Sequence, residues 1–177
     1  TYEWNAENQL KRVLKNGVEH ARFSYDPRGR RVEKVADGIT TSYLYDGKGI
    51  LRESRGAALS KFVHGPGIDE PLAREDGSGA LNYYHTDALG SVVKRTSQVG
   101  GVVHEYRYDA WGGIEAGAGE PGYAFTGREW DAEAGLYYYR ARYYNPTLGR
   151  FLSEDSAPER RAAGMNDEQH PTDHLRE

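Results

Sequence analysis

The chain has 177 residues, with 23 basic and 27 acidic side chains and a formal net charge of −4. This slightly acidic balance argues against a nucleic-acid-binding protein, which needs a basic surface to neutralise phosphates. No run of residues approaches the roughly 18 apolar residues of a membrane span. The absence of cysteine excludes disulfides, thiol nucleophiles and cysteine-based zinc sites.

Aromatic residues carry much of the apolar surface of this sequence. Only 30 residues are Leu, Ile, Val or Phe, whereas Tyr accounts for 14 and Trp for three. Aromatic side chains bury roughly 150–250 Å² each and suit the pleated surface of a sheet. The 22 glycines require many turns. The composition therefore predicts an ordered, β-rich protein with a thin core.

A short motif recurs along the chain with steps of 19 to 22 residues. It reads aromatic, any residue, aromatic, Asp or Asn, and Gly or Asn three positions later. The copies cover residues 2–8, 23–29, 43–49 and 106–112, with a looser copy at 84–90 and a degenerate copy at 62–67. Asp or Asn opens a type I turn by accepting a backbone hydrogen bond, and Gly suits its exit. The predicted turn positions are Asn5, Asp26, Gly29, Asp46, Gly49, Asp87, Gly90, Asp109 and Gly112, followed by Asp131 and Gly135.

A second series of turn signals lies about halfway between the copies of this motif. Its members are Asn16-Gly17, Asp37-Gly38, Gly56, Asp76-Gly77 and Gly100-Gly101. Asn-Gly and Asp-Gly favour the type I′ hairpin turn, in which both central residues have positive φ. Two alternating turn series predict an all-β fold, an antiparallel meander in which each repeat is one hairpin. The period of two along a strand places both aromatics of a copy on one face.

The repeated copies resemble the YD repeat of Rhs proteins, of Tc toxin C components and of teneurins. Residues 83–92 are similar to the opening of the Rhs repeat-associated core, and residues 125–155 are similar to its end. This resemblance covers about residues 2–155. It implies a spiralling β-sheet shell that encloses a variable C-terminal polypeptide, usually a toxin. In many members an aspartyl autoproteolytic activity frees that cargo.

The resemblance divides the chain into YD repeats at 1–80, a repeat-associated core segment at 81–155 and a variable tail at 156–177. The tail has no aromatic residue, and its composition predicts disorder. It is too short for a folded toxin, because domains below about 40 residues rarely fold stably without disulfides, a bound metal or oligomerisation. We expect further repeats upstream, since an isolated meander leaves two unpaired sheet edges.

The resemblance also implies partners and a location. The expected partners are the rest of the same Rhs shell and a C-terminal toxin cargo. Two further expected partners are a component of a secretion spike or injector and an immunity protein. The expected location is secreted or on the cell surface, reached by type VI secretion, by a contact-dependent system or by a toxin-complex injector.

Asp131 and Asp155 are the candidates for catalysis, because an aspartyl protease needs two carboxylates that share a proton. The alternative is that Asp131 opens a turn like the others. The resemblance implies Asp-Pro at the cleavage junction, followed by Gly and Asn at fixed distances. This chain instead continues from Asp155 with Ser, Ala and Pro. We therefore expect a non-catalytic protein.

Arginines and aromatics interleave near the end of the core segment. The cluster consists of Arg128, Trp130, Tyr137, Tyr138, Tyr139, Arg140, Arg142, Tyr143, Tyr144, Arg150 and Phe151. We expect Arg to pack over Tyr rings within a sheet. The alternative is a stacking platform for sugars or single-stranded nucleic acid. A surface adhesion module that binds carbohydrate through Trp111 or Trp130 is a related alternative.

Two further patterns predict neither a cofactor nor a metal. Residues 117–122 match G-x-G-x-x-G, but no helix start follows to hold a pyrophosphate, so we expect a loop. His170 and His174 have the spacing of metal ligands on a helix, but Pro171 lies between them. We therefore expect no bound cofactor and no metal site.

Overall fold

The two alternating turn series divide most of the chain into short strands. The computed structural model describes residues 1–117 and 122–154 and joins eleven strands into one sheet in chain order. These are β1 (Tyr2–Trp4), β2 (Leu10–Lys15), β3 (Val18–Tyr25), β4 (Arg31–Ala36), β5 (Ile39–Asp46), β6 (Gly49–Arg55), β7 (Ala58–His64), β8 (Pro71–Asp76), β9 (Leu81–Thr86), β10 (Val92–Ser97) and β11 (Val102–Glu105). Each is antiparallel to the next, so the predicted meander is confirmed.

Two smaller sheets follow the long one. The first is a single hairpin of β12 (Arg107–Tyr108) and β13 (Ile114–Ala116). The second contains β14 (Gly122–Tyr123), β15 (Glu129–Asp131), β16 (Leu136–Tyr139), β17 (Arg142–Asn145) and β18 (Arg150–Phe151), with the short 3-10 turn η1 (Phe125–Gly127) between β14 and β15. We call β1–β11 the wall and β14–β18 the inner sheet. Among the described residues, no helix has the length and apolar character to cross a membrane.

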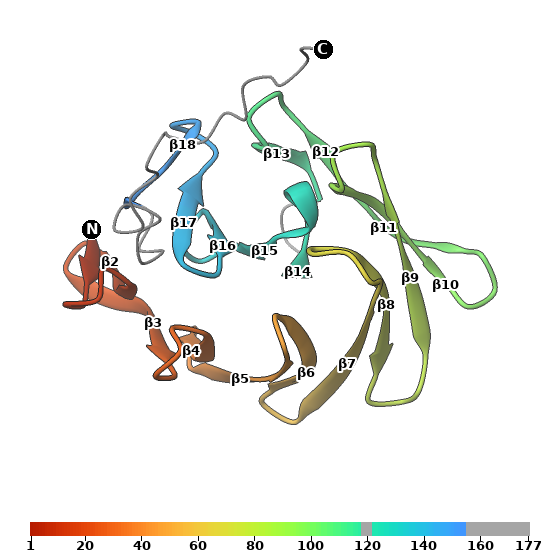
Figure 1. Cartoon of the computed structure of the whole chain (residues 1–177), viewed down its shortest axis with the longest axis horizontal. Helices are drawn as coiled ribbons and strands as arrows, with labels where there is room; N and C mark the ends of the chain where they lie inside the picture. The colour runs from red at the N-terminus through yellow and green to blue at the C-terminus, as the bar shows by residue number, and fades with distance from the viewer. Residues whose placement is uncertain (118–121, 155–177) are drawn as a thin grey trace, which may run out of the picture.

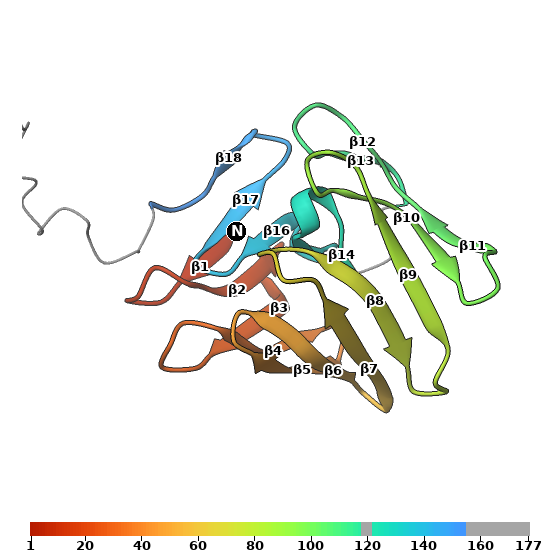
Figure 2. The same cartoon turned by 45° about the vertical axis from the view of Figure 1, so that its right-hand side comes forward.

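The wall is curved, and the hairpin ends that carry the aromatic motif also carry β-bulges. The strand register shifts at Ser24/Tyr25, Leu44/Tyr45 and Val63/His64. A bulge bends its strand and increases the local twist. Repeated at the same end of successive hairpins, bulges curve the whole sheet. Figures 1 and 2 show the result, with the wall wrapped around the inner sheet.

The core lies between the concave face of the wall and the inner sheet. One cluster joins Leu10, Val13, Ala21 and Phe23 of the wall to Ala134, Leu136, Tyr138 and Tyr143. A second joins Tyr43, Ile50, Phe62 and Val92 of the wall to Tyr106, Tyr123, Ala124 and Tyr137. Side chains alternate along a strand, so Tyr137 and Tyr138 point to opposite faces. Both faces of the inner sheet are therefore covered.

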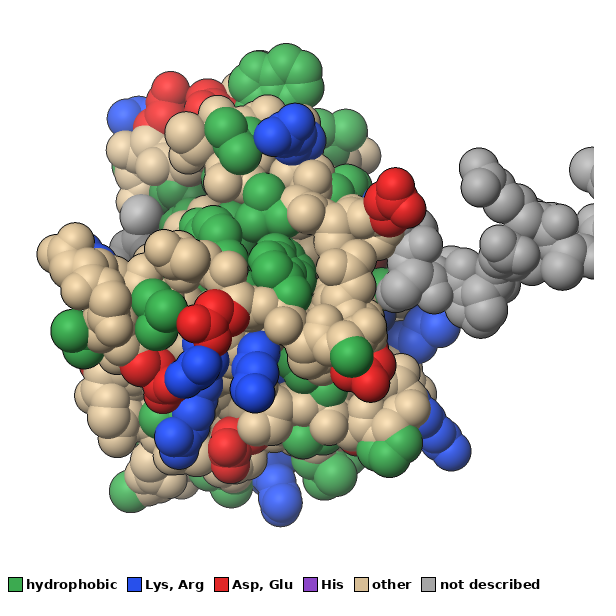
Figure 3. Space-filling view, turned by 90° about the vertical axis from the view of Figure 1, so that its left-hand side faces the viewer, with side chains coloured by type: hydrophobic (Ala, Val, Ile, Leu, Met, Phe, Trp, Pro, Cys, Tyr) green, Lys and Arg blue, Asp and Glu red, His purple; other side chains and the backbone are tan. Residues whose placement is uncertain are grey.

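One side of the molecule shows how this core meets the surface. Figure 3 views the side on which the first wall strands and the last inner strands lie next to each other. Hydrophobic side chains gather in the middle of this face, and charged side chains lie mostly below them. The partly buried Tyr2, Trp4 and Leu152 pack against the first cluster. Tyr2 also donates a hydrogen bond to the carbonyl of Ala134, which ties β1 to the inner sheet.

The structure differs from the predictions in one turn type and in the place of one hairpin. Asp76-Gly77 does not form a type I′ pair; Asp76 ends β8 and opens a longer turn, in which Gly79 has the positive φ of 85°. That prediction was wrong because the carboxylate of Asp76 binds the amides of Ser78 and Ala80. The hairpin around Asp109 also leaves the wall and forms its own sheet. The long sheet runs on across residue 80, and the division into repeats and core segment stays a prediction.

Candidate functional site between the wall and the inner sheet

The Asp and Gly turn positions share one local structure. Asp26 accepts hydrogen bonds from the amides of Arg28 and Arg30, each at 2.9 Å. The amide of Gly29 donates to the carbonyl of Asp26, and Gly29 has φ of 78°. The same arrangement occurs at Asp87 with Gly90 and at Asp109 with Gly112. Such a turn, with its left-handed glycine, makes a three-residue hairpin loop with a bulge.

The other predicted turn positions differ in detail. The side chain of Asn5 accepts a hydrogen bond from the amide of Gln9 at 2.8 Å. Asp46 ends β5 and pairs with Gly49 at the start of β6, across a two-residue connection. Asp131 opens a turn through its carbonyl, which accepts from the amide of Gly135 at 2.9 Å. The Asp131 side chain instead forms ion pairs with residues of the wall.

The aromatic and arginine cluster lies on the inner sheet. Tyr137, Tyr138 and Tyr143 are buried, and Trp130 packs against Tyr137 with ring centroids 4.7 Å apart. The Arg142 guanidinium lies 3.8 Å from the ring centroid of Phe151. Such contacts hold cations over aromatic faces inside the protein.

The remaining arginines of the cluster have separate environments. The buried Arg128 lies over the Tyr139 ring at 5.4 Å and donates to the carbonyl of Tyr138 at 2.9 Å. Arg140 reaches across to the wall loop at Asp69, whereas Arg150 is exposed. Tyr144 is only partly buried, and its hydroxyl donates to the carbonyl of Trp111 at 2.9 Å.

Asp131 sits in a buried ion network that joins the inner sheet to the wall. Its carboxylate pairs with the Arg31 guanidinium and with Nζ of Lys34, the latter at 2.8 Å. Arg31 also pairs with Glu129 at 2.8 Å, and Lys34 with Glu133 at 2.7 Å. The side chains of Arg31 and Asp131 are each only 1% exposed. Two wall cations therefore face three inner-sheet carboxylates.

Aromatic rings surround the central cation of this network. The Arg31 guanidinium lies 4.2 Å from the ring centroid of Tyr138 and 5.1 Å from that of Tyr43. The backbone amide of Arg31 donates to the Tyr138 hydroxyl at 3.0 Å. Burial raises the pKa of Tyr138 to about 12, so this hydroxyl stays neutral. The contacts fix the register of the inner sheet against β4.

The charges of this network determine the protonation of Asp131. Burial by itself would raise the pKa of Asp131, but Arg31 and Lys34 outweigh it and lower that pKa below its ordinary value. An aspartyl protease dyad instead requires one carboxyl group that keeps a proton. Both carboxylate oxygens of Asp131 are also already bound by cations. The second candidate, Asp155, lies outside the described residues.

The sequence reasoning missed Arg31, Lys34 and Asp69. Arg31 lies opposite Tyr25 in the β3–β4 pair, on the face that carries the aromatics of the repeat. This strand alternation was the available signal, since a basic residue at an aromatic-facing position needs a buried partner. Asp69 had no such signal, because it lies in the loop of the degenerate copy.

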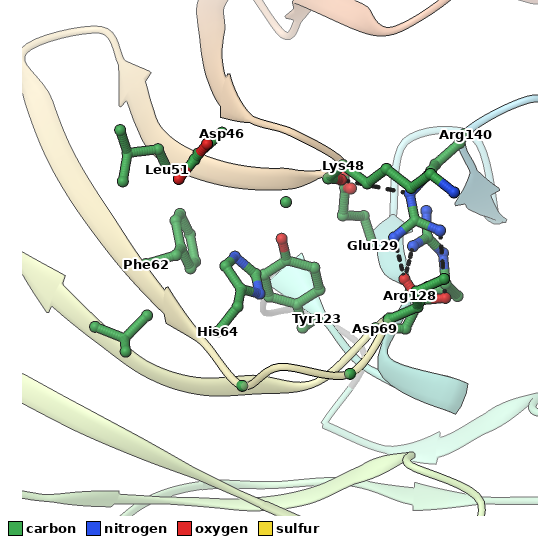
Figure 4. A pocket seen from close by; sticks show the side chains of 15 residues that line it. Asp46, Lys48, Leu51, Phe62, His64, Asp69, Tyr123, Arg128, Glu129 and Arg140 are labelled. Atoms are coloured by element: carbon green, nitrogen blue, oxygen red, sulfur yellow. Dashed lines mark hydrogen bonds and ion pairs between the residues drawn. The ribbon is translucent and has the colours of Figure 1, made fainter.

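A cleft of about 460 Å³ lies beside the network, between the wall loops and the inner sheet. Figure 4 shows Phe62, His64 and Tyr123 along one part of it and Arg128, Arg140 and Asp69 gathered at another. His64 is held by a contact of 2.9 Å between its Nε2 and the carbonyl of Ile50. Within residues 1–117 and 122–154, no three His, Cys, Asp or Glu side chains are grouped so as to hold a metal ion.

The chain is similar in sequence to known proteins. The family model described as teneurin YD-shell matches residues 1–173. The tRNA3(Ser)-specific nuclease WapA of Bacillus spizizenii is 35% identical over 167 residues, which are 89% of this chain and 7% of WapA. The double-stranded DNA deaminase toxin A of Burkholderia cenocepacia is 28% identical over 173 residues, 78% of this chain and 12% of that protein. This chain therefore spans a small part of the relatives that it matches.

Solved structures show the same fold. The crystal structure of TcdB2-TccC3-Cdc42 matches with a TM-score of 0.64 and 22% identity, over 86% of this chain and 9% of that one. TcdB2-TccC3 without its hypervariable C-terminal region gives a TM-score of 0.59 and 23% identity, over 86% and 9%. The turn geometry, the curved wall and the match over nearly the whole sequence agree with each other. The chain belongs to the teneurin YD-shell family and is an Rhs/YD-shell protein.

Proposed function

We propose that this chain is a non-catalytic segment of a β-shell that encloses a C-terminal toxin polypeptide and presents it for delivery to another cell. The curved wall with its covered concave face carries this proposal. Relatives with the names deaminase toxin and toxin protein Tse5 support a toxin as the cargo. The proposed partners are the rest of the shell, the cargo, a spike or injector component and an immunity protein.

In this proposal the inner sheet closes one end of the shell, as the core segment at 81–155 would. The inner sheet is buried on both faces. Ion pairs join it to the wall, and the side chains of Arg31 and Asp131 in these pairs are almost completely buried. Breaking such buried pairs costs several kcal/mol per unpaired charge, so they fix position strongly. The shell is secreted or held on the cell surface, and the tail at 156–177 lies where the family carries its variable part.

The test is protection of the cargo from an external protease. The protein encoded by the full reading frame that contains this chain is purified. Digestion of its C-terminal polypeptide is then followed by mass spectrometry. We expect that polypeptide to be cut much more slowly in the intact protein than when it is expressed alone. The variant Arg31→Ala removes the cation that pairs with Asp131 and Glu129 of the inner sheet, and it should abolish the protection. Equal digestion in the intact protein and in isolation contradicts enclosure.

The same preparation tests the autoproteolytic alternative. A mass that corresponds to cleavage after residue 155, and that disappears in Asp155→Asn, supports an aspartyl protease. We expect the uncut mass, because Asp131 is held ionised by Arg31 and Lys34.

A glycan array tests the adhesion alternative. Carbohydrate binding that is lost in Trp111→Ala supports that alternative, since Trp111 is 63% exposed. Trp130 is less suited to such a role, because its ring packs against Tyr137 in the second cluster. We expect no carbohydrate binding.

A further inference from the structure

We propose that Asp69 of the wall, with Arg128 and Arg140 of the inner sheet, forms a strained latch that holds the inner sheet closed and opens before the rest of the interface. The proposal concerns how these two parts of the chain separate. It goes beyond the shell function and stands whether or not the shell encloses a cargo.

The latch is built on one carboxylate. Oδ1 of Asp69 accepts hydrogen bonds from Nη1 of Arg128 and from Nη2 of Arg140, and Nη1 of Arg140 lies 3.4 Å from Oδ2. Arg128 lies just after η1, and Arg140 lies in the turn between β16 and β17. Figure 4 shows both guanidinium groups converging on Asp69. A single wall side chain thus binds two separate segments of the inner sheet.

Backbone strain gathers at the same point. Asp69, Thr126 and Arg140 have φ of 64°, 50° and 60°. The other non-glycine residues with positive φ in the described part of the chain are Asn8, Asn16 and Asp37. Asn and Asp tolerate this region, Asp69 included, so the strain lies at Thr126 and Arg140. A β-branched residue such as Thr126 is strained in this region. Strained residues of this kind persist only where the surroundings hold them, and they are typical of clamps and switches.

Arg140 occupies a turn position whose backbone conformation favours other residue types. A two-residue hairpin turn with positive φ favours Gly or Asn, which adopt it without cost. Arg140 stands there instead, and its guanidinium reaches Asp69 and the carbonyl of Lys48, the latter at 3.4 Å. The ion pair with Asp69 therefore offsets a backbone conformation that arginine does not prefer.

The wall loop also approaches the inner sheet very closely. A Cβ atom on Gly127 would collide with the carbonyl oxygen of Asp69. The loop is longer than the other turns of the repeat, because the amide of Gly65 bonds to the carbonyl of Glu70, five residues on, where Asp26 bonds to Arg30, four residues on. This copy has Gly65 where the other copies have Asp or Asn, and its loop is one residue longer. The extra length lets Asp69 reach across to the inner sheet.

Exposure decides which contact opens first. The side chains of Asp69 and Arg140 are 25% and 31% exposed and line the cleft, whereas Arg128 is only 3% exposed, so solvent reaches the latch through Asp69 and Arg140. Arg31 and Asp131, in contrast, are almost completely covered. Salt screens partly exposed charges and hardly reaches buried ones. Local opening also begins where solvent reaches the contacts. The latch therefore opens while the Asp131 network remains closed.

Hydrogen exchange measured by mass spectrometry on the purified chain tests the proposal. In Asp69→Asn we expect amides at residues 122–128 and 138–144 to exchange at least about tenfold faster, because two arginines lose their shared carboxylate. Amides of β3 and β4 should keep their wild-type rates. The matched control is Glu70→Gln, since the Glu70 carboxylate bonds the Gly67 amide within the same loop. This control should leave the inner sheet unchanged.

Two further measurements separate a latch from general destabilisation. Arg140→Gly removes the guanidinium and also the backbone strain, so we expect faster exchange at the same amides with no fall in the midpoint of thermal unfolding. About 1 M NaCl should accelerate these amides in the wild type and not in Asp69→Asn. The proposal is overturned if Asp69→Asn exchanges like the wild type. It is also overturned if Glu70→Gln has the same effect, or if the wall and the inner sheet accelerate equally.

Discussion

Replacement of Asp131 by Asn measures how strongly the buried network holds the inner sheet to the wall. The variant keeps the shape of the side chain and removes its charge, so Arg31 and Lys34 each lose a carboxylate partner. Breaking a buried pair costs about 3–5 kcal/mol. Arg31 keeps Glu129 and Lys34 keeps Glu133, so the low end of that range applies. At about 2–4 °C per kcal/mol for a chain of this size, the unfolding midpoint should fall by about 6–12 °C.

The assay is thermal and urea unfolding of the purified chain at neutral pH, followed by circular dichroism. Asp37→Asn is the control, because that side chain is 72% exposed and should change stability by less than about 0.5 kcal/mol. If Asp131→Asn is no less stable than Asp37→Asn, the network does not hold the two sheets together.

The same pair of proteins has a predicted pH dependence. The pKa of Asp131 is lower in the folded protein than its ordinary value of 3.8, because Arg31 and Lys34 outweigh the effect of burial. The stability that the carboxylate contributes is therefore complete above that ordinary value. It is lost as the pH falls through the lower folded value. The difference between the wild type and Asp131→Asn should stay constant down to about pH 4 and shrink below it.

Four further substitutions test other parts of the structure. Burial raises the pKa of Glu53 above its ordinary value of 4.5, so the stability that its protonated form contributes is lost as the pH rises through the raised value. Glu53→Gln should therefore be more stable to urea than the wild type at neutral pH. Below pH 4.5 the two proteins should be equally stable. Gly112→Ala should lose about 3 kcal/mol, because φ is 82° and the new methyl group meets the Phe125 ring. Gly47→Ala, with φ of 56° and open space around it, should lose about 1 kcal/mol in the same unfolding assay. Trp111→Ala should change stability by less than about 0.5 kcal/mol, because the ring is largely exposed.

Local chemistry explains why the hairpins were predictable. Asp26 and Gly29 make their turn with hydrogen bonds between residues no more than four positions apart. Asn16-Gly17 supplies positive φ at both central positions of its hairpin, as the pair predicts. Such contacts need no distant partner, so their signal lies entirely in adjacent residues. The regular spacing of these turns then orders the strands as a meander.

The same local rules do not predict the partner of a side chain when that partner lies far away in the sequence. Asp131 has the sequence context of a turn, and its carbonyl does accept the Gly135 amide. Its carboxylate, however, pairs with Arg31, which is 100 positions away in the sequence. Asp69 in the degenerate copy likewise depends on Arg128 and Arg140. The spacing of residues places Arg31 on the aromatic face but does not identify its partner, and it carries no signal of the contacts of Asp69.

Turn chemistry and strand alternation act over a few residues, so the all-β meander follows from the residues alone. The curvature of the wall around the final aromatic segment, with both faces of that segment covered, depends instead on contacts between distant residues. The physical reason is that bulges at successive hairpin ends add up to a curvature, and the concave aromatic face is buried only by a second sheet. The cations at Arg31 and Lys34 then find their carboxylates on that second sheet, because an unpaired charge in this interior would cost too much.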